Sequence, residues 1–155
     1  MALYYLETSA LVKLYVREPG TDRMIHLASA ATENRFAVLA LSHIEFRSAI
    51  RRRERAGDID PRVAGMILDQ FQQHLEARFL RQVVNDAVLD GAAEMIDRYA
   101  LRAFDAIQLA GCLALKAAVG TESPTFVCSD QRLLEAAQSE LLPIFDPCSE
   151  MDEPS

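Results

Sequence analysis

The sequence predicts a single α/β domain in which helices cover both faces of a mainly parallel sheet. Short apolar runs alternate along the chain with longer stretches of helical periodicity, a pattern typical of strands joined by crossover helices. With 155 residues, half of them apolar and a quarter charged, the chain is long enough to bury one core and too apolar to be disordered. It contains neither an internal repeat nor a linker rich in Pro, Gly and Ser.

Short apolar runs mark the predicted strands. They are Leu3–Leu6, Phe36–Leu39, Phe79–Val84, Thr125–Cys128 and Leu142–Phe145. The predicted helices lie between them and cover Ser9–Arg17, Thr21–Ala30, Leu41–Ala56, Pro61–Ala77, Asp86–Tyr99, Phe104–Val119 and Gln131–Gln138. Glu18-Pro19-Gly20 ends the first helix, Gly57 ends the third, and Pro61 begins the fourth. We expect one domain over residues 1–146 and an acidic, disordered tail over 147–155.

Composition restricts the compartment and the classes of partner. The cysteines, Cys112, Cys128 and Cys148, are odd in number and widely spaced, which predicts neither a disulfide framework nor a zinc site. No apolar run approaches the length of a membrane span, and the first residues lack the layout of a signal peptide. We therefore expect a protein of the reducing cytoplasm, away from membranes. The net charge of −7 argues against a general nucleic-acid binder, because nonspecific binding depends on neutralising phosphates.

Two acids directly follow predicted strands. Glu7 follows the first strand in "LETSALVK", and Asp130 follows "TFVC" just before the last helix. Ligands of open α/β sheets bind beyond the carboxyl ends of the strands, so both positions suit a functional site. Asp130 has a structural alternative as the N-cap of its helix. Thr8 or Ser9 could cap the first helix, which would leave Glu7 without a structural reason.

Asp105 begins a helix that is apolar nearly all round, "RAFDAIQLAGCLALKAAVG". Gln108, Leu109 and Cys112 share its side of that helix. An acid in a first turn gains about 0.3–1 kcal/mol from the helix dipole, whereas an unpaired buried carboxylate costs several kcal/mol. Asp105 should therefore be paired or hold a cation.

Glu45 lies on a helix face whose other members are apolar or small. They are Leu41, Ala49 and Ala56. The alternative, a solvated surface glutamate, predicts polar neighbours on that face. The functional interpretation is favoured for this reason.

These acids and the hydroxyls beside Glu7 form an oxygen-rich set. Such a set suits Mg²⁺ or Mn²⁺ better than zinc, which prefers nitrogen and sulfur ligands. The histidines, His26, His43 and His74, lack metal-ligand spacing. The sequence contains no Walker loop, nucleophile elbow or dinucleotide glycine fingerprint.

The ordered stretches "YYLETSALVKLYVREPG", "LSHIEFRSAIRRR", "LRAFDAIQLAGCLAL" and "FVCSDQRLLEAA" resemble the PIN-domain family, and more narrowly the ribonuclease toxins of bacterial VapBC toxin–antitoxin pairs. The resemblance extends roughly from Leu3 to Phe145 and implies a three-layer α/β/α, Rossmann-like fold with a parallel five-stranded sheet. It places the family's acidic quartet on Glu7, Glu45, Asp105 and Asp130. The chain departs from the pattern at two positions: Glu7 replaces the usual aspartate, and Cys128 stands where a hydroxyl residue is frequent.

The resemblance implies metal-dependent hydrolysis of RNA. Mg²⁺ or Mn²⁺ would be held by Glu7, Asp105 and Asp130, and Glu45 would be an outer ligand or orient the attacking water. The supporting residues would be Thr8, Ser9 and Ser129. The implied products carry a 5′-phosphate and a 3′-hydroxyl. The implied partners are a VapB-type antitoxin, which lays a segment across the site, and a second copy of the chain, a homodimer that the apolar content of the early helices also favours.

The stretch "RSAIRRRERAG" supplies the basic groups that an RNA substrate needs. Arg52 lies two turns beyond Glu45 on nearly the same face, about 10 Å away, within reach of a flanking phosphate. Arg51 is the second RNA-binding candidate. The structural alternative is that these arginines complement the dipole at a helix C-terminus.

Two other functions stay open. Because Glu7 replaces an expected metal ligand, the chain could be a catalytically impaired module that binds RNA or an antitoxin without cleaving. The other is a phosphatase or phosphoacceptor domain, whose chemistry needs an aspartate nucleophile after the first strand and so fits Glu7 less well.

Overall fold

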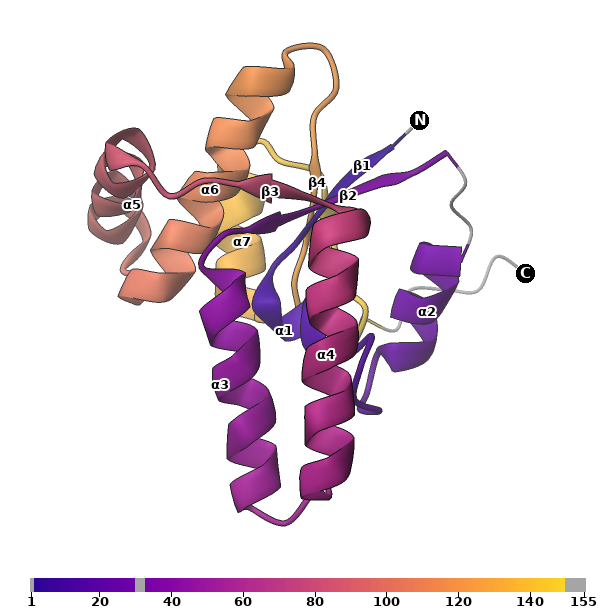
Figure 1. Cartoon of the computed structure of the whole chain (residues 1–155). Helices are drawn as coiled ribbons and strands as arrows, with labels where there is room; N and C mark the ends of the chain where they lie inside the picture. The colour runs from indigo at the N-terminus through magenta and orange to yellow at the C-terminus, as the bar shows by residue number, and fades with distance from the viewer. Residues whose placement is uncertain (1, 30–32, 150–155) are drawn as a thin grey trace.

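The computed structural model describes residues 2–29 and 33–149, and over these residues it shows a five-stranded parallel sheet between two helical layers (Figure 1). The strand order is β3-β2-β1-β4-β5. The strands are β1 (Leu3–Leu6), β2 (Arg35–Leu39), β3 (Phe79–Gln82), β4 (Thr125–Val127) and β5 (Ile144–Phe145). The predicted α/β/α architecture is confirmed. None of the helices in this part of the chain combines the length and the apolarity needed to cross a membrane.

Each face of the sheet has its own core. Three helices cover one face, where Tyr5 and Phe126 stack with ring centroids 5.8 Å apart. They are α5 (Asp86–Tyr99), α6 (Ala103–Val119) and α7 (Gln131–Ser139). Four helices cover the other face, where Phe46 and Phe71 lie 4.0 Å apart between ring centroids. They are α1 (Thr8–Val12), α2 (Thr21–Ser29), α3 (Ser42–Arg55) and α4 (Pro61–Ala77).

The first helix is much shorter than predicted. It ends at Val12 rather than Arg17, because the backbone N–H groups of Leu14 and Tyr15 bond to carbonyls three residues earlier, not four. The apolar residues keep their helical spacing through this tighter turn, so the sequence pattern does not show where the α-helix ends. The last strand is also shorter than predicted, only Ile144–Phe145.

The first residues of the predicted tail lie against the domain. Pro147–Ser149 form a turn, and the Arg23 guanidinium donates hydrogen bonds to the carbonyls of Asp146 at 2.9 Å and Ser149 at 2.7 Å. The rest of the predicted disordered tail, residues 150–155, lies outside the described residues.

Helix α6 approaches the sheet closely at Gly111. A Cβ atom there would lie 2.5 Å from Leu39 Cδ1 and 2.8 Å from the Tyr5 hydroxyl oxygen. A larger residue here would force Leu39 or Tyr5 to shift, and both of those side chains are fully buried. The approach brings the Gln108 carboxamide within 3.1 Å of the Tyr5 hydroxyl.

The order of the strands puts the ends of β1 and β4 at a topological switch point. From β1 the chain builds outward through β2 and β3, then returns to β4 on the other side of β1. Such a point leaves a crevice beyond the carboxyl ends of the two central strands, where ligands of open α/β sheets bind. Glu7 and Asp130 follow these strands.

Candidate active site

Glu7 ends β1 and is itself the N-cap of α1. Its Oε2 accepts hydrogen bonds from the Ser9 N–H at 3.0 Å and from the Ser9 hydroxyl. The suggestion that Thr8 or Ser9 caps this helix is therefore wrong, because the glutamate side chain folds back and does so. Its Oε1 makes no hydrogen bond with any residue that the structure describes, although Glu7 is only 6% exposed.

Glu45 is held by a buried polar network at the start of α3. Its Oε1 accepts from Gln108 Nε2 at 2.7 Å and from the Thr8 hydroxyl at 3.1 Å. Gln108 is fully buried, and its Oε1 in turn accepts from the Tyr5 hydroxyl. The Ser42 hydroxyl also accepts from Gln108, at 3.0 Å. Glu45 is therefore not a freely solvated surface side chain, and Thr8 supports the site by positioning it.

The other two acids begin helices. Asp105 lies in the first turn of α6, partly buried, with no hydrogen bond or ion pair to the described residues. Asp130 is exposed and caps α7, since its Oδ1 accepts from the Leu133 N–H at 3.0 Å. The capping alternative for Asp130 is thus correct, and it leaves Oδ2 available to a ligand.

Electrostatic coupling links the four acids into one cluster. Burial raises the pKa of Glu7 to about 7, with a smaller contribution from the charge of Glu45. Burial also raises the pKa of Glu45, and the charge of Asp105 adds to that shift. Burial and then the charge of Asp130 raise the pKa of Asp105. The acids that the sequence singled out therefore repel one another, which favours a cation among them.

The donor set fits a hard divalent cation. Every acid keeps at least one carboxylate oxygen free of hydrogen bonds to described residues, and oxygen is the ligand type that Mg²⁺ and Mn²⁺ prefer. Within residues 2–29 and 33–149, no three His, Cys, Asp or Glu side chains converge tightly enough to share one ion in this arrangement. The cluster is thus open, and three of these acids could share one ion only if their side chains moved closer together.

Ser9 and Ser129 tie the ends of β1 and β4 together. The Ser129 N–H donates to the Ser9 Oγ at 3.2 Å, and the Asp130 N–H donates to the Cys128 Sγ at 3.2 Å. The Ser129 hydroxyl lies 3.8 Å from the Cys148 sulfur. Ser129 therefore supports the site through its backbone. Cys128 takes the place of a hydroxyl as acceptor for the Asp130 N–H.

The two predicted RNA-binding arginines differ in their surroundings. Arg51 pairs with Glu54 at 2.7 Å. Arg52 is exposed and forms no ion pair with a described residue, and it lines the same cavity as Ser9. The geometry thus favours Arg52 over Arg51 as a neighbour of the acids.

Gln108 and Tyr5 are the residues that the sequence did not assign to the site. The available signal was a polar carboxamide inside an apolar helix, one turn after Asp105. Nothing in the sequence indicated a role for Tyr5, because aromatic residues inside strands commonly belong to the hydrophobic core.

A model of the PIN domain matches residues 4–138. The chain belongs to the PIN-domain family. A relative, "Ribonuclease VapC35" of Mycobacterium tuberculosis, is 34% identical over 149 residues, 94% of this chain and 97% of that protein. The proposed resemblance to VapC proteins is thereby confirmed.

Solved structures confirm the PIN fold. FitAcB from Neisseria gonorrhoeae superposes with a TM-score of 0.65 at 16% identity, over 95% of this chain and 98% of that chain. VapBC2 from Rickettsia felis, bound to a DNA fragment from its promoter, has a TM-score of 0.65 at 15% identity and covers 93% and 98% of the two chains. At these identities the likeness establishes the fold alone.

The raised pKa of Glu7 predicts how the stability of the metal-free PIN domain changes with pH. The folded state holds the Glu7 proton more tightly than the unfolded state, so its contribution is complete below pH 4.5 and is lost as pH rises through about 7. We expect the melting temperature in EDTA to fall by roughly 5 to 10 °C over this range because of Glu7. Melting curves of wild type and Glu7→Gln measure this contribution by difference. Parallel curves for the two proteins would show that Glu7 does not have a raised pKa.

Proposed function

We propose that this PIN-domain protein is a metal-dependent endoribonuclease and the toxin of a type II toxin–antitoxin pair. The observation that carries the proposal is the cluster of four acids at the switch point, each with an oxygen free for a cation. The name of the VapC35 relative, a ribonuclease, supports the reaction, and the toxin–antitoxin complexes among the structural neighbours support the biological setting.

In this proposal Glu7, Asp105 and Asp130 would hold Mg²⁺ or Mn²⁺. When bound, such an ion lowers the pKa of a coordinated water and neutralises charge on the phosphoryl oxygens. Asp130 and Glu7 each hold one oxygen in a helix cap, so their free oxygens are presented in fixed directions. Asp105 is unrestrained by hydrogen bonds and is the ligand that can adjust.

Glu45 orients the attacking water. Gln108 and Thr8 hold its Oε1, which leaves Oε2 to accept a hydrogen bond from water. Its raised pKa makes it a better proton acceptor than an ordinary glutamate. Attack on the phosphorus with departure of the 3′-oxygen leaves a 5′-phosphate and a 3′-hydroxyl.

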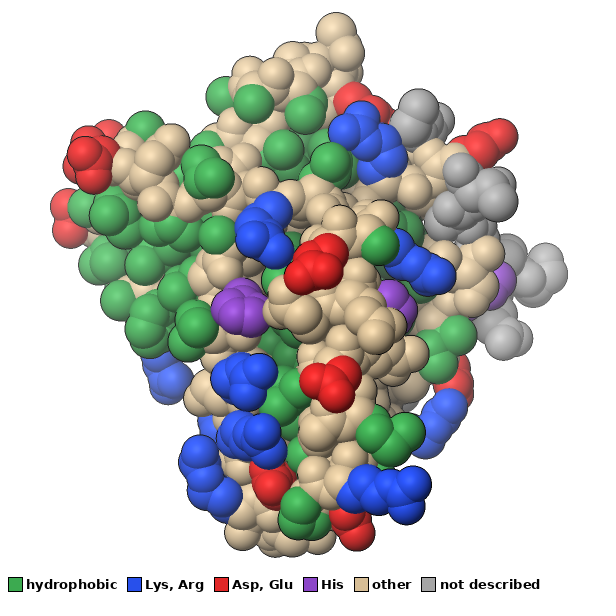
Figure 2. Space-filling view, in the orientation of Figure 1, with side chains coloured by type: hydrophobic (Ala, Val, Ile, Leu, Met, Phe, Trp, Pro, Cys, Tyr) green, Lys and Arg blue, Asp and Glu red, His purple; other side chains and the backbone are tan. Residues whose placement is uncertain are grey.

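The proposed partners are an antitoxin and a second copy of the chain. An antitoxin that lays a basic side chain among the acids would replace the cation and relieve their repulsion. Figure 2 shows apolar side chains gathered over α5. Exposed apolar residues of β3, of α5 and of the loop between them are Leu80, Val83, Leu89 and Ile96. These suit a homodimer, and sedimentation of a monomer at micromolar concentration would contradict it.

A cleavage assay on a mixture of structured RNAs, with Mg²⁺ or Mn²⁺ and with EDTA, tests the proposed reaction. Metal-dependent products with 5′-phosphates support it. RNA binding with no cleavage in either metal would favour the impaired module instead. Trapping of a covalent acyl-phosphate would favour the phosphoacceptor domain.

Glu7→Asp is expected to raise cleavage about ten-fold, equivalent to roughly 1.4 kcal/mol of barrier. Mg²⁺ demands near-ideal octahedral geometry, and glutamate must fold back to place its carboxylate at the end of β1. Aspartate is a favoured N-cap, so the cap of α1 survives the change. Side-by-side assays at saturating Mg²⁺ and Mn²⁺ measure the effect. If the variant is no faster with either metal, the site has adapted to glutamate.

A further inference from the structure

A cavity of about 510 Å³ opens beside the acids, between α1 and α3. Ser9, which donates to Glu7, forms the end of the cavity near the acids. The other polar side chains that line it are charged: Lys13, Glu18, Arg52, Arg53 and Asp58. The cavity therefore adjoins the acidic cluster through Ser9, and its charged lining consists of three cations and two anions.

One carboxylate in this cavity holds two cations. Lys13 Nζ lies 2.9 Å from Glu18 Oε1, and the Arg53 guanidinium donates to Glu18 Oε2. Lys13 is only 6% exposed, and a lysine is almost never buried unless it is paired. Glu18 is shared between Lys13 and Arg53. With Asp58 included, the lining still carries one cation more than it carries anions, and Arg52 has no ion-pair partner among the described residues.

A structural tie between α1 and α3 would need only one cation for Glu18. A tie also does not explain why a cavity that reaches Ser9 lies here, or why Arg52 lines it without an ion-pair partner among the described residues. A phosphodiester group accounts for all three observations, because its two non-bridging oxygens can accept hydrogen bonds from more than one cation and a strand that leads from the acids can place it there.

We propose that this cavity binds a backbone phosphate of an unpaired RNA strand, next to the phosphate that is cleaved. Arg52 and Arg53 contact the phosphate, and the buried Lys13 adds positive charge to the subsite. The inference rests on the proposed nuclease function and names the path of its substrate. Arg52 lies seven residues after Glu45 on α3, about 10 Å along the helix, so a strand with one phosphate at the acids can place a neighbouring phosphate there.

Glu18 acts in this subsite as a stand-in for the phosphate. Without RNA, its carboxylate holds Arg53 and Lys13 in the arrangement that an incoming phosphate requires. When RNA binds, Arg53 can pass from Glu18 to the phosphate, and Lys13 stays paired. Glu18 therefore pre-orients the cations and also competes for them.

The test is binding of a fluorescent single-stranded RNA to the whole chain in EDTA, followed by anisotropy at several salt concentrations. Arg52→Met and Arg53→Met should each weaken binding by about ten-fold. Each should also reduce the slope of log affinity against log salt by about 0.7, the value for one lost phosphate contact with a single strand. Glu18→Gln should strengthen binding several-fold.

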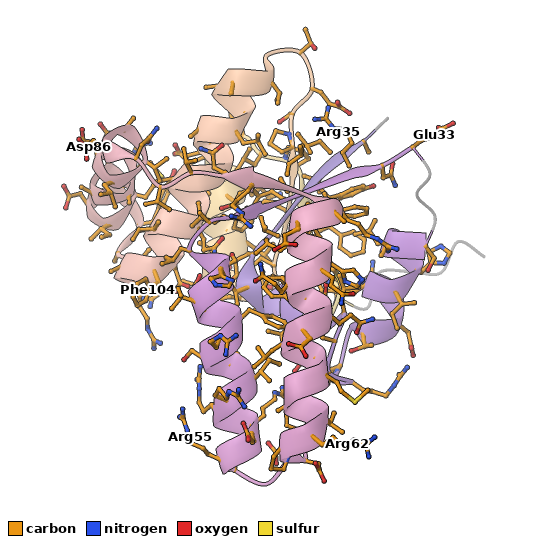
Figure 3. The ribbon with its side chains drawn as sticks, viewed as in Figure 1. Glu33, Arg35, Arg55, Arg62, Asp86 and Phe104 are labelled. Atoms are coloured by element: carbon orange, nitrogen blue, oxygen red, sulfur yellow. The ribbon has the colours of Figure 1, made fainter. Side chains whose placement is uncertain are left out.

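Arg35→Met is the matched control, because Arg35 lies on β2 at the other end of the sheet (Figure 3) and its removal changes the net charge equally. Equal loss of affinity in this variant would mean that only net charge matters and would overturn the subsite. The subsite is also overturned if Glu18→Gln melts at lower temperature without binding RNA more tightly, since that marks a structural tie. A double-stranded RNA that binds as well as the single strand contradicts the unpaired substrate.

Cleavage by wild type in Mg²⁺ separates this inference from the function on which it rests. If wild type does not cleave but the binding differences appear, the nuclease proposal fails and the phosphate subsite stands. If wild type cleaves and Arg52→Met, Arg53→Met and Glu18→Gln all bind like wild type, the subsite fails and the nuclease proposal stands.

Discussion

Asp105→Asn is expected to abolish metal-dependent RNA cleavage. The rate should fall by more than about 100-fold, because a loss of up to about 100-fold is typical of a residue that only supports a metal ligand, and Asp105 is proposed as a ligand itself. The same change should make the metal-free protein more stable. Burial and the charge of Asp130 raise the pKa of Asp105, so its carboxylate is disfavoured in the folded state, and an amide of the same shape removes that repulsion.

Two measurements check this expectation together. Melting curves in EDTA should favour Asp105→Asn over wild type, and added Mg²⁺ should stabilise wild type more than the variant, because a ligand stabilises the state that binds it. Asp69→Asn, at an exposed position on α4, is the matched control and should change neither cleavage nor the response to Mg²⁺. A large loss of stability in Asp105→Asn would instead identify Asp105 as a structural, paired acid.

Gln108→Met should lower cleavage by about 10- to 100-fold, the usual cost of losing a residue that orients a site group. Gln108 donates to Glu45 at 2.7 Å, and this hydrogen bond lowers the pKa of that carboxylate against the effect of burial. Without it the pKa of Glu45 rises further. The acidic limb of the pH–rate profile should therefore move to higher pH, a change that a purely structural role does not produce.

Tyr5→Phe separates the two roles of Gln108. It removes the partner of Gln108 Oε1 but leaves the bond to Glu45, so it should cost about 1–3 kcal/mol of stability from an unsatisfied buried acceptor. Its pH–rate profile should keep the wild-type shape. If Gln108→Met and Tyr5→Phe shift the profile equally, Gln108 acts on the fold rather than on Glu45.

The strand ends and the acids beside them were predictable from the sequence. A carboxylate directly after a buried strand lowers the stability of the fold unless a partner or a ligand offsets its burial. Glu7 and Asp130 were found in this way, and the coupled shifts in pKa now join them to Glu45 and Asp105. The network that positions Glu45 was not predictable. It depends on which residue of α6 faces β1, and periodicity locates a helix face only to within a neighbouring position.

The alternatives considered at the helix starts also show what local pattern can decide. At Asp130 the capping role does not exclude a role in the site, because Oδ1 alone accepts the capping hydrogen bond. At Glu7 the hydroxyl residues seemed better caps, and the longer side chain caps the helix by folding back. Residue preferences indicate which side chains can cap a helix. The packing of the ends of β1 and β4 against each other determines which side chain caps α1.

The close approach at Gly111 has a consequence for how relatives of this protein can diverge. A Cβ atom at this position would meet Leu39 and the hydroxyl of Tyr5, so an ordinary side chain is excluded while both of those residues stay. An alanine at this position would therefore need these two side chains to move or to be smaller. Tolerance of a substitution at Gly111 should thus depend on the residues that stand at position 5 of β1 and position 39 of β2.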